Sequence, residues 1–391
     1  MSLRRADEAV TPIIGTVFIL GITVAGMAVI LLLGAPVLQR LQDEGALRSM
    51  AGQLETVRSE VSSLSIPQTA KAPAIAGSGG SISLESGDHI MVTVDMDTNA
   101  LYRSCDFHVS GWSDFTAVGT SKTEAVTTSG CRTPTVSCTA AAICIRVGYV
   151  DTTSGGVVDT PVTFSAGSIV FVSATQTVTA DQIWRFRLVT AGVTPVTDTV
   201  YAESWLLPTD RLHWFRGSGA GGAEASFEAG AIFLASGGQQ YLEADPFIVE
   251  KSTMGASPPY LLRVPTLTAS PSASISGSSN HDVLLSLLGS DVRVQSETAT
   301  RIRFDINGPL ARPWCDALVL RSSLAALPTG FTYTADGAFP CNSGSSDGTR
   351  SVIYVGAASS SATTSCSSTP STYQCFPFQF SHARITATLQ L

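Results

Sequence analysis

The chain has 391 residues, of which 44% are hydrophobic and only 14% are charged. Lys and Arg number 23 against 31 Asp and Glu, and this net charge of −8 argues against a nucleic-acid-binding protein. The hydrophobic content is too high, and the charge too low, for a chain that is disordered throughout. A weakly charged sequence rich in Gly, Ser, Thr, Ala and Val favours a β-rich surface protein over a cytosolic enzyme.

The first element expected is a long apolar helix near the N-terminus. No charged residue occurs from Val10 to Leu38, and this run exceeds the roughly 18 apolar residues that indicate a membrane-spanning helix. A cleaved secretory signal has a shorter apolar core of about 7–15 residues, so it explains the run less well. We therefore expect this segment to meet a membrane.

Several residues indicate how this helix begins and packs. Thr11 is a suitable N-cap, and Pro12 fits the first helical turn, where its missing N–H has no partner to lose. The small residues Gly21 and Ala25 would let a second helix approach closely. Pro36 is expected to kink or loosen the helix near the end of the apolar run.

A second apolar pattern continues beyond the membrane-spanning run. Its spacings of three and four residues form an a/d seam, which is typical of a helix that packs along one side. Because the pattern ends at Ile66-Pro67, one helix is expected from about Thr11 to Ser65, roughly 80 Å long. Two partners for the seam remain open, the protein's own β-rich part and neighbouring copies of the chain. The seam consists of Leu47, Met50, Leu54, Val57, Val61 and Leu64.

The N-terminal sequence resembles that of a known family. Arg4-Arg5-Ala6, a few polar residues and then Thr-Pro-Ile-Ile-Gly-Thr at 11–16 are similar to the start of archaeal type IV pilins and pilin-like surface proteins. The resemblance implies that a class III signal peptidase cuts after Ala6, with Arg4 and Arg5 as the basic leader and Asp7 as the mature N-terminus. Asp7-Glu8 departs from the family pattern, in which apolar sequence often follows the cut almost directly.

The resemblance also implies partners. In the family the apolar helix first lies in the membrane, is handled by the pilus assembly machinery, and then packs against the helices of other pilins in the filament core. Carried over to this chain, the partners are copies of itself or other pilins. The packing residues ahead of the seam would be Thr11, Pro12, Ile14, Gly15, Phe18, Gly21, Ile22, Ala25 and Leu32.

The remainder of the chain reads as strands and turns. A glycine-rich junction at 77–80 precedes an alternating segment, 81–94, that is expected to form a hairpin with its turn at 85–88. Short strand patterns recur to the C-terminus, and one short helix is expected at 313–327. The fold class is α+β: a long N-terminal hydrophobic helix, like the stick of a lollipop, followed by a mostly β, sandwich-like head. The expected boundaries are a leader at 1–6, the helix at 7–66, a linker at 67–80 and the head at 81–391, with two lobes dividing near 268–279.

Eight cysteines lie beyond the first hundred residues, and none forms a CxxC pair or a zinc-binding pattern with histidine. An even number of cysteines in Ser/Thr/Gly-rich sequence indicates disulfides formed in an oxidising compartment, which places the head outside the cell. Buried free thiols are the alternative. Local pairing would give Cys105–Cys131, Cys138–Cys144, Cys315–Cys341 and Cys366–Cys375.

No pattern in the sequence indicates catalysis. There is no H-E-x-x-H and no G-x-S-x-G. Residues 217–222 satisfy G-x-G-x-x-G, but too little sequence follows for the helix of a nucleotide-binding unit, so a glycine-rich loop is expected. Asp95, Asp97 and Asn99, with Asp106 further on, match calcium-loop positions without the glycine that such a loop requires, which favours a strand-end turn. No cofactor, resident metal or enzymatic activity is expected.

Two function classes follow from these observations. The first is a structural subunit of an extracellular, pilus-like filament, with the N-terminal helices bundled in its core and the β heads exposed for adhesion. The second is a membrane-anchored or filament-tip protein whose head binds a surface. The family-like helix start favours the first class, and the large size of 391 residues gives weight to the second. An extracellular enzyme on a membrane stalk comes third.

Overall fold

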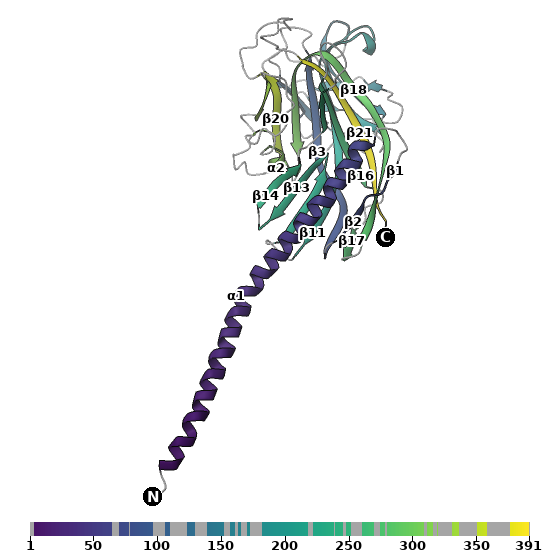
Figure 1. Cartoon of the computed structure of the whole chain (residues 1–391). Helices are drawn as coiled ribbons and strands as arrows, with labels where there is room; N and C mark the ends of the chain where they lie inside the picture. The colour runs from purple at the N-terminus through teal and green to yellow at the C-terminus, as the bar shows by residue number, and fades with distance from the viewer. Residues whose placement is uncertain are drawn as a thin grey trace.

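The computed structural model consists of one long helix that projects from a β-rich head (Figure 1). The chain is therefore α+β, with an apolar N-terminal helix followed by a mostly β region. The structure describes residues 4–64, 70–77, 79–96, 106–109, 123–129, 139–151, 157–160, 163–165, 170–172, 182–217, 222–237, 239–244, 248–251, 260–269, 274–277, 280–308, 311–315, 319, 331–335, 350–357 and 376–390, with backbone alone at some of them, including 4–14, 35 and 36.

Helix α1 (Arg4–Ser63) has 60 residues and is about 90 Å long. It begins before Thr11, so the expected N-cap is wrong; residues 4–9 are mostly strong helix formers, and a proline removes only one backbone donor. The helix is also not interrupted at Pro36. It ends at Ser63, close to the expected end at Ser65.

The head is built on a 17-stranded sheet, counted over the described residues, with a separate 4-stranded sheet in the order β4-β5-β9-β8. The long strands β3, β11, β18 and β21 run the length of the head (Figure 1). The strands are β1 (Ala70–Lys71), β2 (Ala74–Ala76), β3 (Gly80–Met96), β4 (Asp106–Val109), β5 (Thr123–Ser129), β6 (Ile143–Asp151), β7 (Val157–Thr160), β8 (Thr163–Ser165), β9 (Val170–Val172), β10 (Gln182–Thr190), β11 (Thr199–Arg216), β12 (Ala223–Glu228), β13 (Ala231–Ser236), β14 (Gln239–Ala244), β15 (Ile248–Lys251), β16 (Tyr260–Ala269), β17 (Ser274–Gly277), β18 (Asn280–Asn307), β19 (Phe331–Ala335), β20 (Arg350–Ala357) and β21 (Phe376–Gln390).

The expected hairpin at 81–94 is wrong. β3 is one strand, and β11 pairs antiparallel with it from Ser81 to Asp95. The register shifts where residues 208–210 of β11 face 86–89, so the segment expected as a turn is a bulge inside a longer strand. At this bulge the backbone N–H of Asp88 donates to the Glu228 carboxylate at 2.5 Å.

Two segments that were expected to be linkers, the junction at 67–80 and the lobe boundary near 268–279, contain strands of the main sheet. β1 and β2 lie within 67–80, and both pair with β18. β16 and β17 flank 270–273 and belong to the same sheet, and β18 then pairs with both β21 and β3. Of the helix expected at 313–327, the structure describes α2 (Ala311–Cys315) and residue 319.

Two groups of buried apolar side chains hold the head together. One contains Trp314 of α2, and the other contains Trp214 of β11 together with the second half of α1. β13 contributes to both, because neighbouring residues of a strand point to opposite faces. Ile232 and Leu234 belong to the group that includes α1, whereas Phe233 lies 5.8 Å from Trp314, measured between ring centroids.

Candidate functional site

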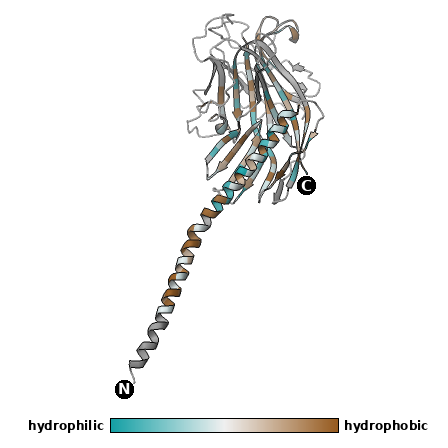
Figure 2. Ribbon diagram, in the orientation of Figure 1, coloured by the Kyte–Doolittle hydropathy of each residue, from teal (hydrophilic) through white to brown (hydrophobic). Residues whose placement is uncertain are grey.

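The part of α1 outside the head, residues 15–41, is called the stalk here, and its apolar side chains are exposed. Val17, Phe18, Ile19 and Leu20 are 62–67% exposed, and four consecutive helical residues cover the whole circumference of a helix. The exposure continues through Leu41 at 59%. Figure 2 shows that apolar residues dominate the stalk and that polar residues gather where α1 meets the head. Nothing in the described chain covers this surface.

α1 contains the single segment of the described residues that is long and apolar enough to cross a membrane, within Gly15–Ser63. Its most apolar stretch has no residue buried inside the protein. The core helix of a soluble protein would be mostly buried, so this apolar stretch of α1 is unlike a core helix. By length and composition the segment suits a membrane anchor or a signal sequence.

The seam of α1 packs on the protein's own head. All six of its apolar residues are buried, with exposed fractions of 0–2%. They share one core with Trp214, Phe227 and Leu234 of the sheet, and α1 lies against β2, β12 and β13. This settles the question that the sequence left open: the seam is occupied within the chain. The seam residues are Leu47, Met50, Leu54, Val57, Val61 and Leu64.

Two arginines fix α1 to the head by hydrogen bonds to backbone carbonyls. Arg58 Nε donates to the Gly230 carbonyl at 2.9 Å. That carbonyl belongs to the tight turn between β12 and β13, in which Ala229 and Gly230 both have positive φ, 47° and 87°, as a two-residue hairpin turn of type I′ requires. Arg263 of β16 donates to the carbonyls of Ser62, at 3.2 Å, and Leu64. A cation there also complements the negative end of the helix dipole.

Further polar contacts surround the seam. Gln53 Oε1 accepts from the backbone N–H of Ala76 at 2.5 Å, which joins α1 to β2. Arg216, at the end of β11, pairs with Asp43 at 3.2 Å just before the seam begins. These contacts are partly exposed and contribute less than the buried seam, but they fix the rotation of the helix on the sheet. We call this whole contact, seam and polar groups together, the joint.

A buried carboxyl group lies on the opposite side of the same hairpin turn. Glu228 is the last residue of β12 and directly precedes the turn in the sequence. Both Glu228 and Asp88 are fully buried. Burial, and then the neighbouring charge of Asp88, raise the pKa of Glu228 well above its ordinary value. Its Oε2 atom has no hydrogen-bond partner among the described residues. Burial therefore favours the protonated form of Glu228 inside the fold.

The structure places the predicted site residues in several different settings. Phe18, Ile22 and Leu32 are 67–76% exposed on the stalk, where Gly21 and Ala25 also lie on the surface. Arg4, Arg5, Ala6, Asp7, Thr11, Pro12 and Ile14 belong to the backbone of α1, and their side chains are outside the described residues.

Two of the eight cysteines fall within the described residues. Cys144 and Cys315 are both disulfide-bonded and buried, and no described cysteine is free. The local pairings stay predictions, because the other six cysteines lie outside the described residues: Cys105, Cys131, Cys138, Cys341, Cys366 and Cys375.

The weaker candidate sites have ordinary structural explanations where they are described. Asp95 forms an ion pair with Arg301 at 2.6 Å, while Asp97 and Asn99 are outside the described residues. Within the described part of the chain, no group of three or more His, Cys, Asp or Glu side chains is arranged to hold a metal. The segment 217–222 connects β11 to β12, which are paired antiparallel, so a strand follows the glycines, as the glycine-rich loop interpretation requires.

Sequence reasoning missed the residues that fix the joint. Arg58 was recognisable only as a charge on the polar side of the seam. Arg263 lies 199 residues from the Leu64 carbonyl that it binds, and no local pattern connects the two. Glu228 ends a strand in which apolar and polar residues alternate, and no local pattern connects it to Asp88, 140 residues away along the chain, whose N–H it binds.

The joint and the stalk together form the candidate site. No family model, no curated protein and no solved structure matches the chain.

Proposed function

We propose that the protein is a structural subunit of an archaeal type IV pilus-like extracellular filament. In this proposal a class III signal peptidase removes residues 1–6, the stalk lies in the membrane before assembly, and the assembly machinery then packs it among the stalks of other subunits. The β head stays outside the cell. The observation that carries the proposal is a fully exposed apolar helix that continues, without interruption, into the core of the head.

The dimensions of the stalk support an assembly role. At 1.5 Å per residue, 17–41 spans about 37 Å, somewhat more than the roughly 30 Å of a hydrocarbon core. Tilting accommodates such an excess in a bilayer, and a filament core accommodates it without tilting. The surface is also uncharged up to Arg40, so neighbouring stalks can pack along it without burying a charge.

The glycines of the stalk support the same role. A Cβ atom added at Gly21 or Gly26 would meet nothing within 4 Å, so packing inside this chain does not require glycine at either position. Glycine in a helix costs about 1 kcal/mol relative to alanine. A close approach by another helix would explain why Gly21 is placed beside Val17 and Ala25.

The second candidate is a membrane-anchored or filament-tip binding protein, and one observation favours it. The seam is occupied by the chain's own head, so it offers no surface to other copies. A single subunit therefore already buries the seam, for which neighbouring copies of the chain were one of the two expected partners. Under this alternative the stalk is a plain anchor, and bulk at Gly21 has no consequence.

Replacing Gly21 with Leu separates the two candidates. Under the proposal, Gly21→Leu leaves membrane insertion intact, because it adds an apolar side chain, but it sharply reduces the number of filaments. Gly21→Ala is the matched control: it raises helix propensity without much bulk and should leave filaments. Both variants are scored by electron microscopy of the producing cells and by membrane fractionation. If parent cells show no filaments containing this protein, and the Leu variant behaves like the parent, the anchored binding protein is the better account.

The processing step has its own test. The protein isolated from its own cells should begin at Asp7, as measured by intact mass or N-terminal sequencing. A chain that retains Arg4 and Arg5, or one cut after residue 34, would contradict cleavage by a class III peptidase.

A further inference from the structure

One face of the main sheet carries a histidine between two glutamates. β11 pairs with β3 and with β12, and its residues Leu212 and Trp214 belong to the core shared with α1. His213 comes between these two in the strand, so its side chain lies on the opposite face of the sheet. Glu85 of β3 and Glu224 of β12 both contact its ring. We call these three residues the histidine site.

The contact with Glu85 determines which nitrogen of the ring carries a proton. His213 Nδ1 lies 2.5 Å from Glu85 Oε1, and an ionised carboxylate can only accept a hydrogen bond. Nδ1 is therefore the donor, and in the neutral ring Nε2 is an acceptor. Arg211 Nε donates to the same Glu85 oxygen at 3.1 Å, which holds this carboxylate in place beside the histidine.

The other nitrogen of the ring faces a second acceptor. His213 Nε2 lies 3.8 Å from Glu224 Oε2, a distance too long for a hydrogen bond. When the ring is neutral, two atoms that carry lone pairs face each other, and a cation between them makes the contact favourable. Burial lowers the pKa of His213 below its ordinary value, despite the neighbouring carboxylates. The ring is therefore mostly neutral at neutral pH, and its own proton does not supply this cation.

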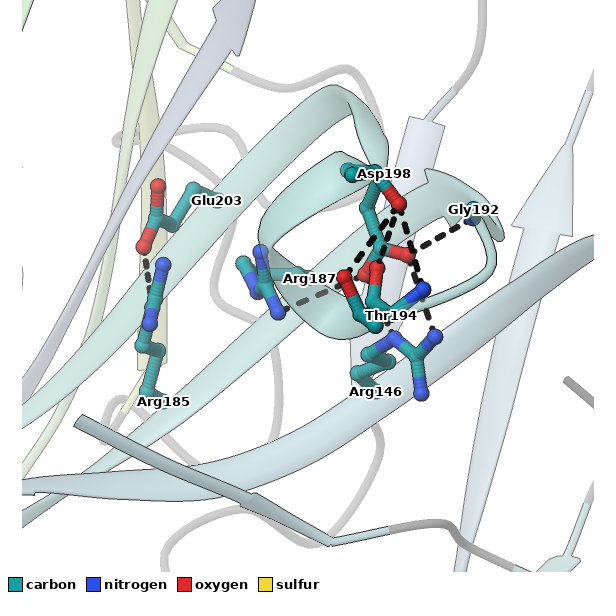
Figure 3. Close-up of polar contacts among 8 residues, drawn as sticks. Arg146, Arg185, Arg187, Gly192, Thr194, Asp198 and Glu203 are labelled. Atoms are coloured by element: carbon teal, nitrogen blue, oxygen red, sulfur yellow. Dashed lines mark hydrogen bonds and ion pairs between the residues drawn. The ribbon is translucent and has the colours of Figure 1, made fainter.

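A complete charged cluster elsewhere in the head shows the difference (Figure 3). Asp198 accepts hydrogen bonds from Arg146 at 2.5 and 3.0 Å, from Arg187 at 3.5 Å and from a backbone N–H at 2.9 Å. Both of its oxygens face donors, its side chain is 0% exposed, and both arginines are under 10% exposed. Glu224 is 42% exposed, and within the described part of the chain His213 is the one polar side chain that its carboxylate contacts. Glu224 therefore faces an acceptor where Asp198 faces donors.

The charges around this contact also favour a cation. Glu85 and Glu224 are carboxylates, and in the described part of the chain Arg211 is the one cation whose charge acts on the ring. One negative charge is therefore left over when the histidine is neutral. We propose that His213 and Glu224 bind a divalent transition-metal ion, Zn²⁺, with water in its remaining positions and Glu85 as a positioning residue behind the histidine.

The geometry of the histidine site suits zinc. A histidine that binds a metal through one nitrogen usually donates its other N–H to a carboxylate, which fixes the ring and raises its basicity, and Glu85 holds His213 in this way. Zinc bonds of about 2.0–2.2 Å in a tetrahedral site place two ligand atoms about 3.4 Å apart. A small rotation of the exposed Glu224 side chain therefore closes the separation of 3.8 Å. Imidazole also favours zinc over Mg²⁺ and Ca²⁺.

The proposed site is a small one. The described residues contain no group of three or more His, Cys, Asp or Glu side chains that could hold a metal, and this site has two protein ligands. Water fills the rest of the coordination shell, so zinc binds more weakly here than at a structural site with four protein ligands. The ion links β11 directly to β12. This inference goes beyond the proposed function and depends neither on membrane anchoring nor on filament formation.

Calorimetric titration with ZnCl₂ tests the site in the full chain, purified in detergent and stripped of metal with EDTA. His213→Gln removes the nitrogen ligand, and Glu224→Gln removes the carboxylate charge with little change of shape. Glu85→Gln weakens the hold on the ring. Glu243→Gln is the matched control, because it removes one exposed carboxylate from β14, outside the site. Circular dichroism verifies that each variant is folded.

We expect His213→Gln to lose one zinc ion per chain, and Glu85→Gln to keep that ion with an affinity about 10- to 100-fold lower. Glu224→Gln should bind it more weakly than the unmodified chain, and the control should match the unmodified chain. An excess of Ca²⁺ should leave the zinc bound. If His213→Gln does not fold, the near-isosteric Glu224→Gln decides alone.

Two outcomes would overturn the inference. One is that the unmodified chain binds no zinc, which would leave the histidine and its two glutamates as an ordinary polar cluster. The other is that zinc binding is the same in the unmodified chain, in His213→Gln and in Glu224→Gln, which would place the ion elsewhere. An unchanged affinity in Glu85→Gln would overturn its assignment as the positioning residue. None of these results bears on whether the stalk enters a membrane or a filament.

Discussion

At the scale of single residues, two buried acids of this protein shift their pKa in opposite directions. Glu228 is fully buried next to Asp88, and burial together with that negative charge raises its pKa. For Asp198, burial alone would raise the pKa, but hydrogen bonds and charges from Arg146, Gly192 and Arg187 outweigh it, so the pKa is lowered. The same side-chain chemistry thus gives opposite dependences of stability on pH.

Glu228 should make the head less stable as pH rises. The unfolded chain loses this proton near the ordinary pKa of glutamate, whereas the folded chain keeps it to higher pH, so the free energy of unfolding falls between those two values. Glu228→Gln mimics the protonated acid and should remove that decline. The measurement is denaturant unfolding at pH 5 and pH 8, with Glu224→Gln, a partly exposed residue on the same strand, as the control. A variant whose stability still falls like that of the parent would exclude Glu228 as the cause.

Asp198 should have the opposite effect in acid. Its stabilising contribution is present above the ordinary pKa of aspartate and is lost as pH falls through its lowered folded-state pKa. Asp198→Asn removes the charge that two buried arginines share and should cost roughly 3 kcal/mol at neutral pH. The variant should lose less stability than the parent between pH 5 and pH 3, measured by thermal unfolding. If the two curves stay parallel in acid, the cluster does not control this transition.

At the scale of elements, α1 performs two different tasks along one helix. Its first half exposes apolar side chains on all sides, and its second half buries one row of them in the head. The same residue type therefore has different consequences in the two halves: Leu54 is 1% exposed, whereas Leu31 is 69% exposed.

Leu54→Ala should destabilise the head by about 2–5 kcal/mol, because it leaves a cavity between α1 and the sheet. Leu31→Ala should change the unfolding of the head by less than about 0.5 kcal/mol, because that side chain has no partner inside the chain. Both are measured by denaturant unfolding of the detergent-solubilised protein, followed by tryptophan fluorescence. Equal effects of the two substitutions would mean that the seam does not stabilise the head.

Periodicity explains how much of these elements the sequence could predict. A spacing of three and four residues predicted the helix and the six residues of its buried side, because that pattern arises from helix geometry alone. The partner of the seam could not be predicted, since Trp214, Phe227 and Leu234 are more than 140 residues away along the chain. The residues at 85–88 have turn composition, but a bulge needs the same conformational freedom as a turn. Only the pairing with β11 distinguishes the two.

At the scale of the whole molecule, the stalk and the head share one hydrophobic core. Six residues of α1, from Ala46 to Val61, and Leu64 just after the helix belong to the same buried group as residues of β2, β3, β11, β12, β13, β16, β18 and β21. The head is therefore incomplete without the second half of the helix. A boundary drawn after the helix at 66 would cut through this core, whereas a cut before Asp43 would leave it intact.

Two truncated chains test this division. A chain that begins at Arg40 keeps the seam, the Asp43–Arg216 pair and both arginine contacts to α1, and it lacks the exposed apolar stalk. It should be a soluble monomer whose unfolding midpoint matches that of the full chain in detergent. A chain that begins at Pro67 exposes the faces of β12 and β13 that Met50, Leu54 and Val57 cover, and it should aggregate or stay unfolded. Size-exclusion chromatography and circular dichroism distinguish these states. A folded, monomeric chain from Pro67 onward would show that α1 is only an anchor attached to an independent domain. The core of the head would then be complete without the second half of the helix.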